Sequence, residues 1–146
     1  MNEIYNKYEN LNQLVKRYHN DSLYASKPLP KLIAVSKKQP DEKILSALKI
    51  GQRIFGENKL QEALKRWKDL INLYRDIELH CIGHLQSNKV KKALKFFDVI
   101  HTLDRESLAL EISKNLTSTS KTKKFMIQVN TGNEKNKSGV SLDDFE

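Results

Sequence analysis

Short apolar runs alternate with helical patterns along the whole chain, and this alternation constrains the fold more than any other feature. The first run, 32–35, lies between Pro30 and Pro40, and later runs follow at intervals of roughly 20–25 residues, as βα units do. The later runs are 53–56, 79–83, 98–101 and 125–129. Strands separated by helices pair in parallel, because each helix carries the chain back to the same end of the sheet. We therefore predict an α/β fold with about five βα units, either an open doubly wound sheet or a (β/α)8 barrel.

Helical patterns fill the spaces between the predicted strands. Apolar residues at steps of three and four predict an amino-terminal helix that ends near Asn20. After the first strand, Asp41 and Glu42 suit the first turn of a helix, because carboxylates are favoured at that end of the helix dipole. Gly51 closes the same helix, since glycine adopts the left-handed conformation at a helix end without strain.

The length and spacing of these elements indicate one domain. We assign residues 1–146 to a single incomplete barrel domain, with the amino-terminal helix within 1–23 and the βα units within 31–140. At Ser141 another helix-like pattern begins, with a capping residue followed by acidic residues. We therefore expect the βα series to be cut off within an element.

The formal net charge of +8 raises the question of a nucleic-acid partner. Only 5 of the 26 basic residues are arginine. Arginine is the residue best suited to bidentate hydrogen bonds with phosphate groups and with the edges of bases. The lysines are spread along the chain, and aromatic residues do not interleave with them as in a stacking platform. We expect a solvated lysine surface and no nucleic-acid partner, with a basic α/β RNA-binding module as the alternative.

The sequence also indicates the compartment. No apolar stretch approaches the roughly 18 residues of a membrane span. The first residues lack the basic and then apolar pattern of a secretory signal. Cys81 is the single cysteine, which suits a reducing environment and a buried structural role. We predict a cytoplasmic protein with no membrane partner and no internal disulfide.

Lys37 and Lys38 follow the first strand at the carboxyl end of the predicted sheet, where α/β folds bind ligands. Alternation along the strand places Val35 and Lys37 on one face, and Ser36 and Lys38 on the other. A lysine amine in apolar surroundings is neutral more readily, and a neutral amine can attack an aldehyde. The alternative interpretation is a pair of solvated lysines at a strand end.

Polar residues also follow the second, third and fifth predicted strands, and include Asn58, His84 and Lys137. Each has a structural explanation by itself, but together they gather at the carboxyl rim of a parallel sheet. His80 and His84 have the spacing of zinc ligands on a helix, yet this segment is a strand that leads into a loop. We predict no metal site. No serine lies in a Gly-x-Ser-x-Gly turn, so serine nucleophile chemistry has no support.

Four motifs occur in a characteristic order and spacing: Ala34-Val35-Ser36-Lys37, Phe55-Gly56-Glu57-Asn58, His80-x-Ile82-Gly83-x-Leu85-Gln86-x-Asn88-Lys89, and Val129-Asn130 with Lys137-Ser138-Gly139. This set closely resembles the pyridoxal phosphate (PLP) homeostasis proteins, which are single-domain relatives of the alanine racemase barrel. The resemblance runs from about Leu32 to Gly139. It implies a partial (β/α)8 barrel of the alanine racemase N-terminal-domain type. His84 departs from the family, where a proline is common.

The resemblance also implies which residues hold the cofactor. Lys37 would form the Schiff base, because it follows Ala-Val-Ser as the family's lysine does. Lys38 falls where the family often has a threonine, and would not bind PLP covalently. Lys137 matches a second family lysine near the site, and Asn58 lies at the barrel mouth, so both are expected to contact the cofactor.

The implied role is intracellular PLP homeostasis: the chain would hold a reactive aldehyde without catalytic turnover, and PLP-dependent apo-enzymes would receive it. It is therefore predicted not to be an enzyme and to have no catalytic residues. The second domain of the racemases, which supplies their other catalytic base, has no counterpart. Besides the RNA-binding module, the alternatives are a catalytic racemase-like protein and a fragment with no competent site. The oligomeric state is not fixed by the sequence.

One departure from the family concerns the cofactor phosphate. The family's carboxyl-terminal third contains a Ser-Met-Gly-Met-Ser stretch and an Arg-Ile-Gly stretch, which grip the phosphate and meet the pyridine nitrogen. In (β/α)8 barrels the phosphate site generally follows strands seven and eight. From this sequence we expect a barrel of about five strands without that cradle, in which cofactor binding depends little on the phosphate.

Overall fold

The computed structural model of the protein describes residues 2–142, and in this range five strands alternate with helices. The strands are β1 (Ala34–Val35), β2 (Ile54–Glu57), β3 (Glu78–Cys81), β4 (Val99–Leu103) and β5 (Lys124–Ile127). The helices are α1 (Asn2–Asn20), α2 (Asp41–Lys49), α3 (Leu60–Leu73), α4 (Val90–Phe96) and α5 (Glu106–Asn115), with a 3-10 turn η1 (Ser87–Lys89) before α4. The predicted number and order of elements are confirmed.

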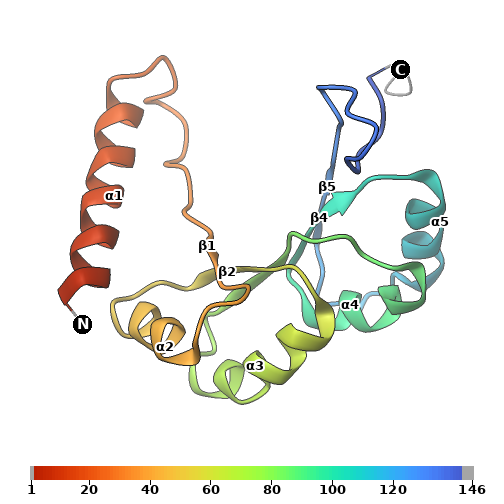
Figure 1. Cartoon of the computed structure of the whole chain (residues 1–146), viewed down its shortest axis with the longest axis horizontal. Helices are drawn as coiled ribbons and strands as arrows, with labels where there is room; N and C mark the ends of the chain where they lie inside the picture. Colours follow the sequence, from red (N-terminus) through yellow and green to blue (C-terminus); the bar gives the residue numbers. More distant parts are fainter. Residues whose placement is uncertain (1, 143–146) are drawn as a thin grey trace.

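The five strands form one parallel sheet in the order β1-β2-β3-β4-β5. A doubly wound sheet reverses its strand order at a switch point, whereas a barrel adds each strand beside the one before it. The unbroken order therefore decides between the two predicted architectures in favour of the barrel type. Figure 1 shows the strands as a curved sheet, with α2, α3, α4 and α5 arranged along its outer side.

The hydrophobic core lies between the sheet and these helices. Phe55 and Leu79 from neighbouring strands are fully buried against it. Trp67 from α3 packs on Phe55 with 4.6 Å between ring centroids, and Phe97 follows α4 into the same core. These apolar side chains exclude water from the outer face of the sheet and hold the strand ends in place, which positions the loops of the carboxyl rim.

Three strands are shorter than the sequence predicts, and of these β3 ends at Cys81 instead of Gly83. In β1 the pairing begins only at Ala34, because the Leu32 carbonyl accepts a hydrogen bond from the Gln52 side chain, 3.0 Å away. After β5, Val129 forms an isolated parallel bridge with Val140 instead of extending the strand. The helix expected from Ser141 extends into 143–146, which lie outside the described residues.

Helix α1 ends at Asn20, as the periodicity predicts, and stands to one side of the sheet (Figure 1). Its apolar stripe remains largely open to solvent: Leu11 is 49% exposed and Tyr18 is 67% exposed. The amphipathic pattern thus predicted the helix but not the surface that it covers. Within 2–142, no helix combines the length and the hydrophobicity that crossing a membrane requires.

Candidate functional site

Lys37 lies in a tight turn immediately after β1, at the carboxyl end of the sheet. The Gln39 N–H donates a hydrogen bond to the Ser36 carbonyl over 3.1 Å and closes the turn. The side chain of Lys37 is exposed, which differs from the apolar environment expected from alternation, because the strand already ends at Val35 and Val35 is itself 48% exposed. Within residues 2–142, no carboxylate forms an ion pair with the Lys37 amine.

Asn58 follows β2, the strand next to β1 in the sheet. Its Oδ1 atom is buried and has no hydrogen-bond partner among the described residues. Buried amide oxygens without a partner are uncommon, because the lost solvation is not recovered. The structure therefore brings Lys37 and Asn58 to adjacent strand ends. It leaves the Asn58 Oδ1 as an acceptor that no described residue uses.

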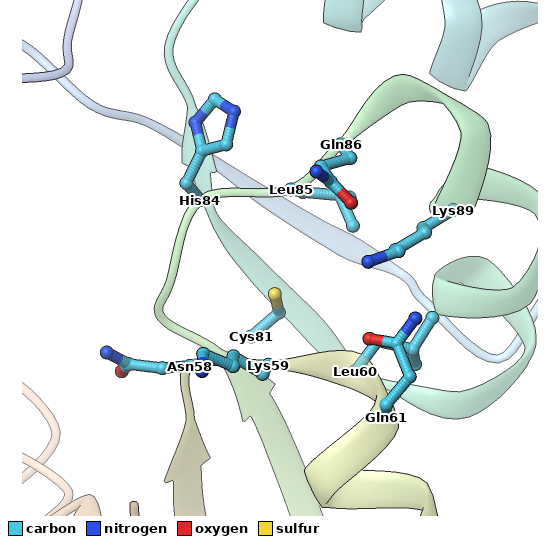
Figure 2. Close-up of a pocket in the computed structure, with 9 residues that line it drawn as sticks. All are labelled: Asn58, Lys59, Leu60, Gln61, Cys81, His84, Leu85, Gln86 and Lys89. Atoms are coloured by element: carbon cyan, nitrogen blue, oxygen red, sulfur yellow. The ribbon is translucent and has the colours of Figure 1, made fainter.

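A cavity of about 230 Å³ opens beside Asn58, between the loops that follow β2 and β3 (Figure 2). Lys89 extends across it toward Gln61, and the Cys81 sulfur points into it from β3. Burial raises the pKa of the Cys81 thiol to about 11, so the thiol stays protonated at neutral pH. Cys81 is thus a buried structural residue, in agreement with the sequence prediction.

Gly83 allows the loop after β3 to approach Asn58 closely. A Cβ atom at this glycine would lie 2.2 Å from the Asn58 carbonyl oxygen, a backbone atom that cannot move aside easily. Gly83→Ala is expected to lower the free energy of unfolding by about 1–3 kcal/mol, because the two loops must separate. Urea denaturation would measure this loss. Gly132→Ala is the matched control, since its Cβ would meet only side-chain atoms of Glu134, at 3.5 Å or more. Equal losses in both variants would contradict the close-packing explanation.

His84 forms a rim cluster with the residues that follow β4. Its Nδ1 lies 3.2 Å from Asp104 Oδ2, and Asp104 also pairs with Arg105. The Arg105 guanidinium donates to the Leu85 carbonyl over 2.9 Å, so the loops after β3 and β4 are tied together. Asp104 was not predicted as a rim residue, because the predicted strand ends at His101, whereas β4 extends to Leu103 and places Asp104 directly after the strand.

His80 shares no partner with His84 and belongs to a second cluster on the sheet itself. Its Nδ1 lies 2.7 Å from His101 Nε2, and its Nε2 lies 2.9 Å from Glu78 Oε1. Burial and the neighbouring His80 lower the pKa of His101. Burial acts to raise the pKa of Glu78, but bonds from His80 and Lys31 outweigh it and lower that pKa. Among the described residues, no group of three potential ligands is arranged to hold a metal ion.

The lowered pKa of His101 predicts a loss of stability on mild acidification. Because the unfolded chain binds this proton more readily, stability is present above the ordinary pKa of 6.5 and is lost as pH falls toward the folded-state pKa. Glu78 acts in the same direction, but only below its ordinary value of 4.5. His101→Gln should therefore flatten the dependence of the unfolding free energy on pH between about pH 7 and 5.

Urea denaturation at several pH values would measure this effect. His19→Gln is the control, because His19 lies on α1 and should leave the dependence unchanged. If the unfolding free energy of His101→Gln depends on pH as that of the wild type does, the His80–His101 pair does not contribute to this dependence.

Lys137 lies in the loop after β5, at the opposite edge of the sheet from β1. This loop folds back on itself through the Asn130 N–H, which donates to the Val140 carbonyl over 2.8 Å. The Lys137 side chain is exposed and forms no hydrogen bond or ion pair with residues in 2–142. The structure therefore brings Lys37 and Asn58 to adjacent strands and places Lys137 three strands further along.

Arg66 is the residue of this region that sequence reasoning missed. It lies on α3, far along the chain from the Lys37 turn, and bonds to the carbonyl oxygens of Ser36 and Gln39. Neither its spacing nor its neighbours in the sequence distinguish it from a solvated helix residue. Only its place beside the buried Glu57 in the folded chain reveals the connection.

The chain is similar in sequence to a protein family and to curated relatives. A family model, the alanine racemase N-terminal domain, matches residues 9–146. The pyridoxal phosphate homeostasis protein of Vibrio alginolyticus is 43% identical over 112 residues, which make up 75% of this chain and 48% of the relative. That of Aquifex aeolicus is 42% identical over 110 residues, covering 75% of this chain and 47% of the relative. The chain spans about half the length of these curated relatives.

Solved structures agree with the sequence comparison. PipY of Synechococcus elongatus without PLP superposes with a TM-score of 0.72 at 37% identity, over 89% of this chain and 60% of that chain. The PLP-bound form of PipY gives a TM-score of 0.55 at 43% identity, over 62% and 43% of the two chains. A protein from Bifidobacterium adolescentis gives 0.76 at 25% identity, over 95% and 59%.

These similarities confirm two predictions made from the sequence. The first is the partial barrel of the alanine racemase type, which the strand order also supports. The second is the resemblance to the PLP homeostasis proteins, carried by the motifs at the strand ends. This chain belongs to the alanine racemase N-terminal domain family, among the pyridoxal phosphate homeostasis proteins.

Proposed function

We propose that this chain binds pyridoxal 5'-phosphate as a Schiff base on Lys37 and serves PLP homeostasis in the cytoplasm. The observation that carries the proposal is the turn after β1, which presents Lys37 at the carboxyl end of the sheet without an ion pair to any described carboxylate. A lysine amine of this kind can add to an aldehyde carbon with loss of water. The PLP-bound structure of PipY, a relative at 43% identity, supports the choice of ligand.

The residues around Lys37 fit such a group. PLP, when bound, supplies a reactive aldehyde and several hydrogen-bonding atoms. The half-buried Asn58 side chain, whose buried Oδ1 has no partner in residues 2–142, offers a hydrogen bond at the neighbouring strand end. Its oxygen and nitrogen can exchange places by rotation, so it can serve a donor or an acceptor. We propose that Asn58 orients the cofactor and that the exposed Lys137 contributes a positive charge from the loop after β5.

We further propose that the chain holds PLP without catalytic turnover and passes it to apo-enzymes that require it. The relatives that support this role are named for homeostasis and not for a reaction. Because the chain spans about half of their length, the role of the whole protein is extended to this chain as a proposal.

A titration would test the proposal. PLP added to the full chain is expected to change the visible absorbance of the aldehyde in a saturable way, because the carbonyl is converted to an imine. Pyridoxamine phosphate, which has an amine in place of the aldehyde, is the matched control and should give no such change. A linear, unsaturable change with PLP would indicate only slow reaction with surface lysines and would contradict a defined site.

A further inference from the structure

The turn that presents Lys37 contains a residue in an uncommon backbone conformation. Lys38 has a φ of 57°, in the left-handed region that side chains other than glycine, asparagine and aspartate rarely adopt. Such a residue persists only when its surroundings hold it in place. The single hydrogen bond between the Gln39 N–H and the Ser36 carbonyl closes the turn, so a further restraint is needed.

Arg66 supplies that restraint from α3. Its Nη1 donates to the Ser36 carbonyl over 2.8 Å, and its Nη2 donates to the Gln39 carbonyl over 2.8 Å. The two carbonyls are the first and the last of the turn, so one planar guanidinium spans it. A lysine could not do the same, because its ammonium lacks the fixed fork of donors.

Arg66 is itself held on both sides. Its Nη1 lies 3.0 Å from Oε1 of the fully buried Glu57, and its Nε lies 3.0 Å from Asp41 Oδ1. Glu57 Oε1 also accepts hydrogen bonds from Trp67 Nε1 over 2.9 Å and from Ser36 Oγ over 2.7 Å. Burial lowers the pKa of Arg66, but the bonds to the two carboxylates outweigh it and raise that pKa above its ordinary value.

The turn also separates the two neighbouring lysines. Lys38 lines a groove of about 520 Å³ on the helix side, together with Asp41 and Glu62. Lys37 is exposed and does not line this groove. The left-handed conformation at Lys38 is what reverses the chain between them, so loss of this conformation would let the two amines exchange surroundings.

We propose that Arg66 is a positioning residue for Lys37: by spanning the turn it keeps Lys37 at the carboxyl mouth of the sheet and Lys38 against the helices. This inference rests on the proposed function, because it explains why one lysine of the pair would react with PLP. Asp41 acts through Arg66, whereas Glu57 acts both through Arg66 and through its own hydrogen bond from Ser36 Oγ.

The first test follows the turn without PLP. Arg66→Lys keeps the positive charge but loses the two guanidinium nitrogens that donate to the Ser36 and Gln39 carbonyls. Hydrogen exchange of the Gln39 amide should become about tenfold faster, because local opening of the turn costs less free energy. Arg53→Lys is the matched control. Arg53 bonds to the Leu48 carbonyl and Asp76, each over 2.8 Å, at the amino end of β2, so the Gln39 amide should be unaffected.

The second test follows the choice of lysine. After incubation with PLP and reduction with borohydride, the ratio of label on Lys37 to label on Lys38 should fall about tenfold in Arg66→Lys, equivalent to about 1.4 kcal/mol. Arg53→Lys should keep the wild-type ratio, although this variant also loses a partly buried guanidinium bond, the one to the Leu48 carbonyl. Asp41→Asn removes the negative charge beside the Arg66 Nε and leaves the other Arg66 bonds in place. It should shift both measurements in the same direction, and it keeps the test decisive if Arg66→Lys does not fold.

The inference is overturned if Arg66→Lys and Asp41→Asn match Arg53→Lys in both the exchange rate and the label ratio. A wild-type chain that takes no label on Lys37 would instead overturn the proposed function. In that case the exchange rate of the Gln39 amide still decides whether Arg66 holds the turn.

Discussion

Replacing Glu57 with alanine is expected to lower the free energy of unfolding by about 3–5 kcal/mol, because it leaves the charge of Arg66 partly unpaired in a buried setting. Glu57 is fully buried, and its Oε1 receives hydrogen bonds from Ser36, Arg66 and Trp67. The change would also leave the indole N–H of Trp67 without an acceptor. Native domains have a total stability of only about 5–15 kcal/mol, so this variant would be close to unfolding.

Urea denaturation followed by circular dichroism would measure the loss. Glu57→Gln keeps an acceptor near the three donors and should lose less, about 1–3 kcal/mol. Glu62→Ala is the matched control: this glutamate lies on α3, the helix that carries Arg66, and its exposed pair with Lys59 should be worth at most about 1 kcal/mol. Similar losses in Glu57→Ala and Glu62→Ala would show that the buried network contributes little.

Replacing Lys37 with alanine is expected to abolish the saturable reaction with PLP and to weaken binding more than about tenfold. The covalent bond cannot form without the amine, and the remaining contacts must hold the cofactor alone. The absorbance titration would measure this effect, with protein stability checked by thermal melting.

Two further variants test whether the reaction with PLP requires the amine of Lys37. Lys37→Arg keeps the positive charge, but a guanidinium stays protonated and cannot form a Schiff base, so it should behave as the alanine variant does. Lys38→Ala should leave the titration within about twofold of wild type, since Lys38 faces the helices. Loss of the saturable reaction in Lys38→Ala but not in Lys37→Ala would contradict the assignment.

Most of the fold could be predicted from the sequence, because the apolar runs that form the strands face a single core. Phe55 and Leu79, for example, occupy buried positions of two adjacent strands and stand out as apolar residues in short runs. Gly51 ends α2 with a φ of 97°, as its place after the helical pattern indicates. The strand order could not be predicted in the same way, since both α/β architectures use the same alternation of elements.

The site was predicted only in part. Lys37 and Asn58 could be proposed as site residues because each stands two positions after an apolar run, and the structure places them at adjacent strand ends. Arg66 could not, because its contacts with Ser36 and Gln39 join segments that are distant in the sequence. The left-handed conformation of Lys38 was equally hidden, since lysine is not a residue that favours it.

Peptide mapping would show directly whether PLP is held covalently on Lys37. The full wild-type chain would be incubated with PLP, reduced with borohydride, digested and analysed by mass spectrometry for label on every lysine. The label is expected to saturate on Lys37, while Lys38, Lys137 and the surface lysines carry only a slow background. Label distributed evenly over these lysines, or saturating on another residue, would contradict this expectation.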